Sequence, residues 1–437
     1  MRIIFLSELY PPHGRGAQIA TKRLAEKLAS LGISVDIITN KFDDEKEEEY
    51  LNNICIHRRK LFPKKLHIVN YESFLNLHSE NIIREIINDG IIGNILHRST
   101  VIHVADLWFC AIPVLKKLLD VPVVASINSY AHVCYYVSTA KYYDYKAICS
   151  ECKLQRCILK NNISGFKNYK RLLRGFVTPL EVLYAGSKIS RYIYSLTYAD
   201  AIIAPSQYSK THTLRFIPSK HVFKLRNKIV IIPYVIPDNI QQVPYESRNE
   251  NFSLIYMGGS DVSKGYLNLL RAMPYVVKRN PKIRLFMVMT YNDQLISKFI
   301  RKYKLEDNIF PLPWLNESEM PELFKKIDML IAPSVWPETF LQVVVEANLR
   351  GRAAIVPQIG AAREYTINGV NGFLVNSFSI NSLARKILEI SKLPKEMIIS
   401  MGDNARKLAL NKFNSERVIR SYINLYTKLA GINRRNL

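Results

Sequence analysis

A chain of 437 residues exceeds what one ordinary hydrophobic core supports, so two domains of about 200 residues each are expected. Its 48% apolar and 22% charged residues are typical of a globular protein and exclude bulk disorder. No apolar run approaches the roughly 18 to 20 residues of a membrane-spanning helix, and residues 1–6 lack the apolar region of a signal peptide. Six cysteines do not make a secreted disulfide scaffold at this length. We therefore expect a cytoplasmic enzyme.

The net charge of +24 is concentrated in one stretch of the chain. Residues 153–228 contain fifteen lysines and arginines but only two acids, a surplus of +13. Such a surplus attracts anionic lipid headgroups, pyrophosphate-linked substrates or nucleic acid. No usual nucleic-acid-binding motif occurs, so we predict no nucleic-acid partner and expect peripheral contact with an anionic cytoplasmic membrane face. The alternative is a basic surface that serves only solubility.

The first half of the chain alternates strand-like and helix-like segments. Helix 17–31 is predicted by Ala20, Leu24, Leu28 and Leu31, which share one face, and it ends at Gly32. A second helix is predicted over residues 179–198, and the acidic run 43–49 predicts a solvated loop. The predicted strands are residues 2–6, 33–39, 101–104, 121–127, 201–204 and 229–232.

The second half restarts the same rhythm, with strands 252–257, 284–288, 329–332 and 353–357 and helices 265–278, 293–302 and 318–325. Two successive alternations predict an α/β protein with two doubly wound, Rossmann-like domains facing a central cleft. We expect an N-terminal, acceptor-binding domain over residues 1–235 and a C-terminal, nucleotide-sugar-binding domain over 236–413. Residues 233–251 form the predicted linker, and residues 414–437 a helix that packs back on the first domain.

Two carboxylates, Glu338 and Glu346, stand eight positions apart in residues 333–347, PSVWPETFLQVVVEA. This run begins as a polar loop after an apolar strand and ends in a helix-like stretch. Eight positions is a little over two helical turns, which predicts both carboxylates on roughly one side, one at the helix mouth. The backbone N–H groups of Phe340 and Leu341 could then hold phosphate. This is the chemistry of a nucleotide-sugar site.

A glycine-rich loop is predicted in each half, directly after the first strand. Lys264 follows Gly258 and Gly259 and precedes a predicted helix, where a cation is electrostatically unfavourable, so a role in binding a diphosphate is favoured over a solvated lysine. The loop with Gly14 and Gly16 is only a partial dinucleotide fingerprint. It is interpreted as a loop facing the cleft, with simple turn chemistry as the alternative.

Together these motifs resemble the GT-B retaining glycosyltransferases of family 4. The resemblance covers nearly the whole chain and is densest over residues 252–375. The segments that carry it are Tyr10-Pro-Pro with Gly14 and Gly16, Gly258 with Lys264-Gly265, Pro337-Glu338-Thr-Phe with Glu346-Ala, Gly360-Ala-Ala-Arg-Glu364, and Asn368-Gly-Val-Asn-Gly372.

The resemblance implies a role for each matching residue. Catalytic roles fall on Glu338, which would bind the donor sugar's hydroxyls, on Lys264, which would hold the diphosphate, and on Asn128. The donor-binding residues would be Glu346 at the ribose, with Phe340, Leu341, Thr339, Gly258 and Gly259, and the acceptor-side loop would be Gly14, Arg15 and Gly16. The implied reaction is front-face transfer of a hexose-type sugar from a nucleotide-diphosphate sugar to a lipid-linked or polymeric glycan. It proceeds with retention and without an obligatory metal.

The chain differs from the family pattern at three positions. Gly259 stands where the family usually has arginine, Leu341 where it often has glycine, and Asn128 where it has histidine. Asparagine can hydrogen-bond a hydroxyl but cannot take a positive charge. The alternative hypothesis is therefore a non-catalytic homologue that binds a sugar nucleotide or a glycan.

Four cysteines form a second constellation within an expected insertion at about residues 130–160, namely Cys134, Cys149, Cys152 and Cys157. Four thiolates with a C-x2-C pair can meet the tetrahedral geometry of structural Zn²⁺, although the spacing is not that of a standard finger. Disulfides and free thiols remain alternatives, and His132 is an alternative ligand. The expected role of the metal is to hold a long loop, not to catalyse.

Overall fold

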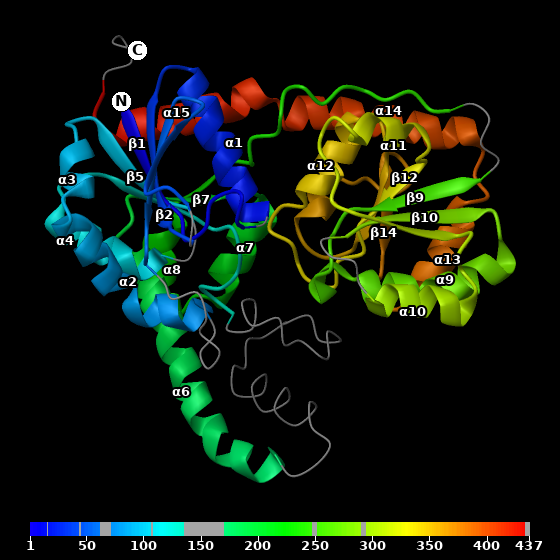
Figure 1. Cartoon of the computed structure of the whole chain (residues 1–437), viewed down its shortest axis with the longest axis horizontal. Coiled ribbons are helices and arrows are strands. Elements are labelled where there is room, and N and C mark those ends of the chain that lie inside the picture. Colours follow the sequence, from blue (N-terminus) through cyan, green and yellow to red (C-terminus); the bar gives the residue numbers. More distant parts are fainter. Residues whose placement is uncertain are drawn as a thin grey trace. The chain divides into compact units, whose positions relative to one another are not determined.

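The computed structural model describes residues 1–14, 16–42, 45–61, 71–105, 108–134, 170–246, 251–289 and 294–432. The chain divides into two compact units, shown in Figure 1. Unit 1 comprises Met1–Val235 and Ser415–Leu437, and unit 2 comprises Ile236–Asn414. Each unit contains its own sheet, which confirms the prediction of an α/β protein with two parallel-sheet domains.

Unit 1 is built on an eight-stranded sheet with the order β3-β4-β2-β1-β5-β6-β7-β8. All neighbours pair in parallel except β3, which is antiparallel to β4. The central strands are almost wholly apolar and buried, as expected for a parallel sheet covered on both faces. The strands are β1 (Arg2–Leu6), β2 (Ser34–Asn40), β3 (Glu48–Leu51), β4 (Ile54–Arg59), β5 (Thr100–Val104), β6 (Val123–Ser126), β7 (Ala201–Ala204) and β8 (Ile229–Ile231).

The first and last helices of the chain pack in the same core of unit 1. Leu24 and Leu28 of α1 and Tyr422 and Tyr426 of α15 share a hydrophobic cluster with the central strands. The helices are α1 (Gly16–Ser30), α2 (Tyr71–Asn88), α3 (Ile91–Ile95), η1 (Trp108–Ala111), α4 (Ile112–Leu118), α6 (Lys170–Leu196), α7 (Gln207–Phe216), α8 (Ser219–Arg226) and α15 (Ser415–Leu429). None of the helices in the described ranges is long and apolar enough to cross a membrane.

A buried histidine links α15 to the sheet of unit 1. His103 Nδ1 lies 2.8 Å from the Tyr426 hydroxyl, and His103 Nε2 lies 2.7 Å from Ser126 Oγ. Burial lowers the pKa of His103 to about 3, so the ring is neutral at physiological pH. A neutral imidazole donates from one nitrogen and accepts at the other, and both are used here.

Unit 2 is a six-stranded, all-parallel sheet with the order β11-β10-β9-β12-β13-β14. Its strands are β9 (Phe252–Tyr256), β10 (Ile283–Val288), β11 (Ile309–Leu312), β12 (Met329–Ile331), β13 (Ala354–Pro357) and β14 (Gly372–Val375). The helices are η3 (Val262–Lys264), α9 (Tyr266–Arg279), α10 (Gln294–Tyr303), α11 (Met320–Lys325), α12 (Gln342–Leu349), η4 (Ala361–Glu364), α13 (Ile380–Ile390) and α14 (Lys395–Lys412).

The strand order of unit 2 reverses between β9 and β12, because β9 to β11 run toward one edge and β12 to β14 toward the other. The connections that follow β9 and β12 therefore diverge to opposite faces of the sheet. In doubly wound sheets, ligands bind outside the carboxyl ends of the strands at this switch point.

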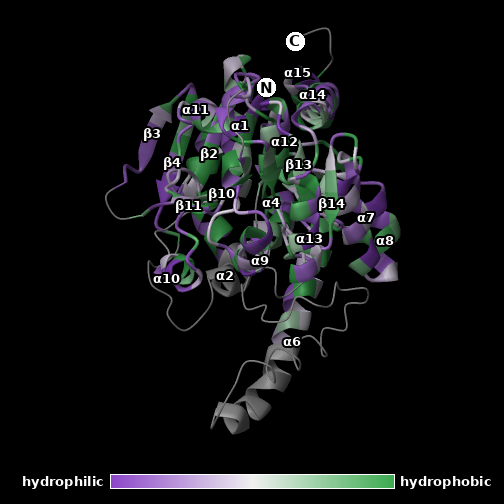
Figure 2. Cartoon of the chain, turned by 90° about the vertical axis from the view of Figure 1, so that its right-hand side faces the viewer, coloured by the Kyte–Doolittle hydropathy of each residue, from purple (hydrophilic) through white to green (hydrophobic). Residues whose placement is uncertain are grey.

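Three local predictions need correction. Helix α6 begins at Lys170, not at residue 179, and so continues through a proline that would ordinarily mark a first turn. Leu31 lies outside α1 and is exposed. The acidic run is not a loop throughout, because Glu48 and Glu49 begin β3, the hydrophilic edge strand that is purple in Figure 2.

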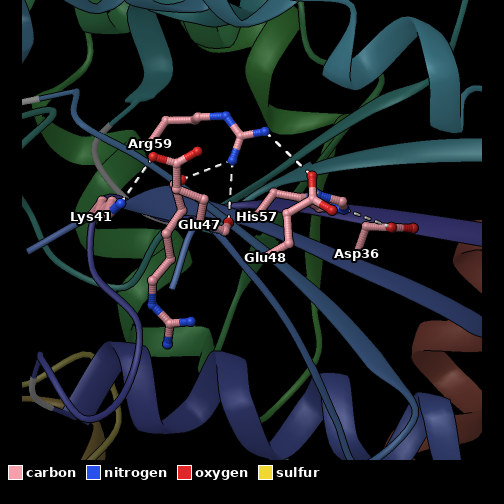
Figure 3. Close-up of polar contacts among 7 residues, drawn as sticks. Asp36, Lys41, Glu47, Glu48, His57 and Arg59 are labelled. Atoms are coloured by element: carbon pink, nitrogen blue, oxygen red, sulfur yellow. Dashed lines mark hydrogen bonds and ion pairs between the residues drawn. The ribbon is translucent and has the colours of Figure 1, made fainter. Parts of the chain in front are cut away.

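Strand β3 was not predicted because its sequence, EEYL, has no alternation of apolar and polar residues. Its two acids pair with cations of β4, and Glu47, just before β3, pairs with Lys41 (Figure 3). The paired side chains are Arg59 with Glu48 at 3.4 Å, Lys41 with Glu47 at 2.9 Å, and Arg58 with Glu49 at 2.7 Å. His57 also belongs to β4, and its Nε2 lies 3.1 Å from Oδ1 of the buried Asp36 on β2.

Candidate functional site

An ion pair crosses the switch point of unit 2. Lys264, at the end of η3 after β9, donates from Nζ to Oε1 of Glu338, in the connection after β12, at 2.8 Å. The carboxylate side chain is 13% exposed and the ammonium side chain 35%, so the anion is the more enclosed partner. The two residues lie 74 positions apart in the chain, and the adjacent strands β9 and β12 bring them together.

Glycine allows the two connections to touch. Gly265 has φ +80°, and a Cβ atom there would lie 1.9 Å from the Pro333 carbonyl oxygen. The Val335 amide donates to the Ser263 carbonyl at 2.9 Å, which ties the connections together a second time. Any larger residue at position 265 would separate the backbones that position the ion pair.

Ser334 is a site residue that the sequence analysis missed. Its hydroxyl is buried and lies 2.9 Å from Glu338 Oε1 and 3.0 Å from the Ser263 carbonyl oxygen. The single hydroxyl proton is donated to one of these acceptors at a time. A serine four residues before Glu338 has no distinguishing pattern, so only the folded loop reveals it.

A third connection, after β13, closes on the backbone of Glu338. Gly360 has φ +82°, and a Cβ atom there would lie 2.7 Å from the Glu338 nitrogen. The Ala361 amide of η4 donates to the Glu338 carbonyl at 2.9 Å. Arg363, on the same short helix, is exposed. Glu338 is thus held at both its side chain and its backbone.

The prediction that Glu338 and Glu346 lie on one side of the same helix is wrong. Helix α12 begins at Gln342, and its N-cap is Leu341, so Glu338 lies in the preceding loop, whereas Glu346 lies within the helix and is half-buried. The position of Glu338 is set by Lys264 and Ser334 and not by helical periodicity. The predicted helix start was too early because the apolar run continues through Phe340 and Leu341 into α12.

Phe340 and Leu341 enter α12 packed against an aromatic cluster. The Phe340 ring is buried. Its centre lies 5.3 Å from the centre of the Phe413 ring, in an edge-to-face arrangement, and 6.1 Å from the centre of the Tyr365 ring. The Tyr365 hydroxyl donates to the Leu341 carbonyl at 3.4 Å. Burial raises the pKa of Tyr365 well above its usual value, so the hydroxyl keeps its proton. Thr339 is also buried.

The glycine loop after β9 folds over a buried tyrosine. The Tyr256 hydroxyl donates to the Gly259 carbonyl at 3.0 Å, and a Cβ atom on Gly258 would lie 2.3 Å from that hydroxyl. Gly259 itself has φ +67°. Burial raises the pKa of Tyr256 well above its usual value, which preserves the donor. Glycine at position 259 therefore accompanies a left-handed backbone that a side chain there would strain.

In unit 1, the loop with Gly14 follows β1 and is anchored by a buried arginine. Arg58 donates from one guanidinium nitrogen to the Pro11 carbonyl at 3.3 Å and pairs with Glu49 at 2.7 Å and Glu45 at 3.4 Å. Gly14 (φ +106°) and Gly16, the first residue of α1, are exposed. Arg15 lies outside the described residues.

Both ends of the Asn128 amide are engaged inside unit 1. Its Nδ2 donates to the Ala105 carbonyl, and its Oδ1 accepts from the Tyr234 hydroxyl at 3.0 Å. Asn128 thereby connects the carboxyl ends of β5 and β6 to the segment after β8.

Of the predicted zinc ligands, only Cys134 lies in the described part of the chain, where it is half-buried and not in a disulfide. Cys149, Cys152 and Cys157 fall outside it. No cluster of three or more histidine, cysteine or acidic side chains suited to a metal occurs among the described residues. His132 is buried with Nε2 3.0 Å from Thr213 Oγ1, and burial lowers its pKa to about 3.

Two family models cover most of the chain. The model of Glycosyltransferase Family 4 matches residues 14–236, and that of Glycosyl transferases group 1 matches residues 238–408. The second match contains every residue of the Lys264–Glu338 site, and the first contains the Gly14 loop and Asn128.

Curated relatives agree with this assignment. An uncharacterised glycosyltransferase of Methanocaldococcus jannaschii is 22% identical over 446 residues, 98% of each chain. An uncharacterised 41.2 kDa protein from the cps region of Klebsiella pneumoniae is 29% identical over 185 residues, 41% of this chain and 48% of that protein. A lipopolysaccharide 1,2-N-acetylglucosaminetransferase of Salmonella typhimurium is 23% identical over 235 residues, 51% of this chain and 60% of that protein. The matches to the last two span about half of those proteins.

Solved structures show the same fold. Sucrose-phosphate synthase from Thermosynechococcus elongatus superposes with a TM-score of 0.74 at 18% identity over 98% of each chain. HepE of Anabaena, in complex with UDP-glucose, has a TM-score of 0.67 at 15% identity over 98% of this chain and 100% of that one. With both halves matched by family models, the chain belongs to glycosyltransferase family 4, among the group 1 glycosyl transferases, and has the GT-B fold.

Proposed function

We propose that this glycosyltransferase is a retaining enzyme that transfers a hexose from a nucleotide-diphosphate sugar to a lipid-linked or polymeric glycan. The observation that carries the proposal is the enclosed Glu338 carboxylate, held by Lys264 and Ser334 at the switch point of unit 2. The bound UDP-glucose of HepE and the acceptor named for the Salmonella relative support the donor and acceptor classes.

The donor would be recognised by charge and by hydrogen bonds. Glu338 accepts hydrogen bonds from hydroxyls of the hexose, because an ionised carboxylate is a pure acceptor. Lys264 remains within reach of Glu338 and places its more exposed ammonium toward the diphosphate. The amides of Phe340 and Leu341, at the start of α12, add hydrogen bonds to phosphate. Glu346 receives the ribose hydroxyls, and Gly258 and Gly259 let the backbone approach the donor.

In the proposed reaction the bond between the sugar C1 and the leaving phosphate oxygen breaks. The acceptor oxygen bonds to C1 from the same face, and its proton passes to the leaving phosphate oxygen. No protein nucleophile is required, so catalysis comes from positioning and from stabilising the negative charge that develops on the diphosphate. We assign that stabilisation to Lys264 and to the amides of Phe340 and Leu341. The proposal involves no obligatory catalytic metal.

Unit 1 would bind the acceptor. We assign acceptor-side contacts to Gly14, Arg15 and Gly16 and a hydroxyl contact to Asn128. Gly14 and Gly16 are exposed, so a glycan could approach them closely. The basic surplus of this half favours peripheral attachment to an anionic cytoplasmic membrane face, which would bring a lipid-linked acceptor within reach.

A donor panel tests the proposal. Purified protein is mixed with UDP-, GDP- and ADP-hexoses, and a donor that binds the folded state raises the melting temperature. With the best donor, we expect Glu338→Gln, which keeps the shape and removes the charge, to lower nucleotide release at least about 100-fold. Glu389→Gln, on the exposed face of α13, is the matched control and should leave turnover unchanged.

The outcome has two clear readings. Retained turnover in Glu338→Gln would refute the site, and a product with inverted anomeric configuration, read by NMR of the new linkage, would refute retention. The second candidate function is a non-catalytic sugar-nucleotide binder. It is favoured because the Asn128 amide is already hydrogen-bonded to the Ala105 carbonyl and the Tyr234 hydroxyl, and because Gly259 replaces the arginine that is usual in the family. Calorimetric binding of a donor with no nucleotide release in the presence of acceptor extracts would select it.

A further inference from the structure

One surface of unit 1 carries exposed aromatic rings beside exposed cations. Phe223 of α8 is 80% exposed, more than any other large hydrophobic residue in the described ranges. Tyr194, near the end of α6, and Tyr198, just beyond it, are also exposed, and their hydroxyls contact each other. We call this surface the basic-aromatic patch; its residues are Tyr194, Tyr198, Lys220, Phe223, Lys224 and Arg226.

Helix α8 exposes an aromatic ring and two lysines on one face and buries a leucine on the other. Lys220 and Lys224 are one turn apart, and Phe223 lies on the same face between them. Leu225, on the opposite face, is fully buried and attaches α8 to unit 1. The Lys224 ammonium lies 5.5 Å from the centre of the Tyr198 ring, which joins the two parts of the patch.

The chain segment that contains α8 carries charge of one sign. No aspartate or glutamate occurs from residue 201 to residue 237. Two other cations of this stretch are directed inward, because Lys210 donates to the Ile229 carbonyl and Lys228 to the carbonyls of Thr197 and Ala199. Lys220, Lys224 and Arg226 are exposed. The surface thus combines an apolar ring with cations that no acid of the same stretch balances.

We propose that the basic-aromatic patch docks unit 1 on an anionic lipid surface. Phe223 enters the boundary between headgroups and acyl chains, and Lys220 and Lys224 contact lipid phosphates. Tyrosines suit such a boundary because one end of the side chain is apolar and the other hydrogen-bonds. The inference rests on the proposed function and deepens it, because it names the surface by which unit 1 would attach to the anionic membrane that carries the acceptor.

The test is co-sedimentation of the full chain with phosphatidylcholine vesicles, with and without phosphatidylglycerol. Wild-type protein should bind only the anionic vesicles, and less as salt increases. Phe223→Ala should weaken this binding about tenfold. The double charge reversal Lys220→Glu/Lys224→Glu should weaken it by about tenfold or more.

Unit 2 offers matched controls. Lys298 and Lys302 of α10 are exposed and one turn apart. The Lys302 ammonium lies 5.3 Å from the centre of the Tyr303 ring, which resembles the contact between Lys224 and Tyr198. The reversal Lys298→Glu/Lys302→Glu changes the net charge equally and should leave vesicle binding within about twofold of wild type. Trp314→Ala removes another exposed aromatic ring and is the control for Phe223→Ala; it should leave vesicle binding unchanged.

Equal loss in the α10 and α8 variants would overturn the proposal, because binding would then follow net charge alone. Retained vesicle binding in the α8 variants, with loss of binding to a single-stranded oligonucleotide, would also overturn it and assign the patch to nucleic acid. The vesicle assay needs no donor, so its failure is separate from failure of the proposed function. Donor hydrolysis should be unchanged in Phe223→Ala.

Discussion

The two units differ in the nitrogen bases that they bury, because only unit 1 contains histidine. All nine histidines of the chain lie in residues 1–235, and residues 236–414 contain none. Unit 1 buries His103 and His132 and half-buries His212, and this burial lowers their pKa to about 3, 3 and 4. Unit 1 also buries Arg58, which pairs with acids. Unit 2 instead buries the guanidinium of Arg352, which keeps its charge and binds backbone carbonyls.

The difference teaches where acid should act. A buried neutral imidazole must be protonated when the chain unfolds at low pH, whereas a buried guanidinium is charged in both states. Two sheets of the same class can therefore respond differently to pH.

The largest effect is expected from Arg352→Met. The Arg352 guanidinium donates to the carbonyls of Ile327, Phe324, Val243 and Pro244 and stacks 3.5 Å from the Tyr245 ring centre. Methionine fills the volume but leaves these buried carbonyls without donors, so unit 2 should lose about 5 kcal/mol. Urea unfolding followed by hydrogen exchange resolves the two units. The exposed Arg363→Met is the control and should change stability by less than about 0.5 kcal/mol.

Acid should next destabilise unit 1 selectively. The folded pKa of His103 and of His132 is depressed to about 3, below the value of about 6.5 expected in the unfolded chain. Stability is therefore fully present above pH 6.5 and is lost as pH falls toward 3. At pH 5, each of these two histidines should lower the free energy of unfolding of unit 1 by about 2 kcal/mol relative to neutral pH.

Hydrogen exchange at a series of pH values measures this loss for each unit. His103→Gln/His132→Gln should flatten the pH dependence of unit 1 while lowering its stability at pH 7. An unchanged slope in that variant would contradict the assignment of acid sensitivity to these two rings.

A smaller effect is expected at the Gly14 loop. Arg58→Ala removes the guanidinium that joins the Pro11 carbonyl to Glu45 and Glu49, and it leaves these acids facing one another. We expect a loss of about 3 kcal/mol in unit 1. Arg59→Ala, one position along β4 and more exposed, should cost less than about 1 kcal/mol. Similar losses in the two variants, measured by chemical denaturation, would show that Arg58 has no special role.

The smallest effect concerns Tyr256 in unit 2. Tyr256→Phe deletes the hydroxyl that donates to the Gly259 carbonyl and should cost about 1 kcal/mol of stability. Because the loop loses its anchor, donor affinity measured by calorimetry should fall several-fold more than in Tyr275→Phe, an exposed-residue control. Equal donor affinities would mean that glycine geometry alone shapes the loop.

Much of the fold was predictable because buried parallel strands are continuous apolar runs. Residues 2–6 and 201–204 were predicted with the bounds that β1 and β7 have in the structure. The weakest region was residues 40–100, where β3 and β4 form a charged hairpin. Ile54 and Ile56 of β4 pack in the core of unit 1, but β3 has no buried apolar face and its acids pair with cations of β4, so no apolar period in the sequence indicates β3.

For the candidate site, the sequence by itself determined which residue types occur and the family to which they belong. Glu338, Lys264 and the glycines were recognisable because sugar and phosphate chemistry needs carboxylates, cations and open backbone at those spacings. Only the tertiary structure decided how they are held. Glu338 lies in a loop and not on a helix, and Ser334, Gly265 and Gly360 position it through contacts between connections from three strands. Such contacts depend on strand order in the sheet, which local periodicity does not encode.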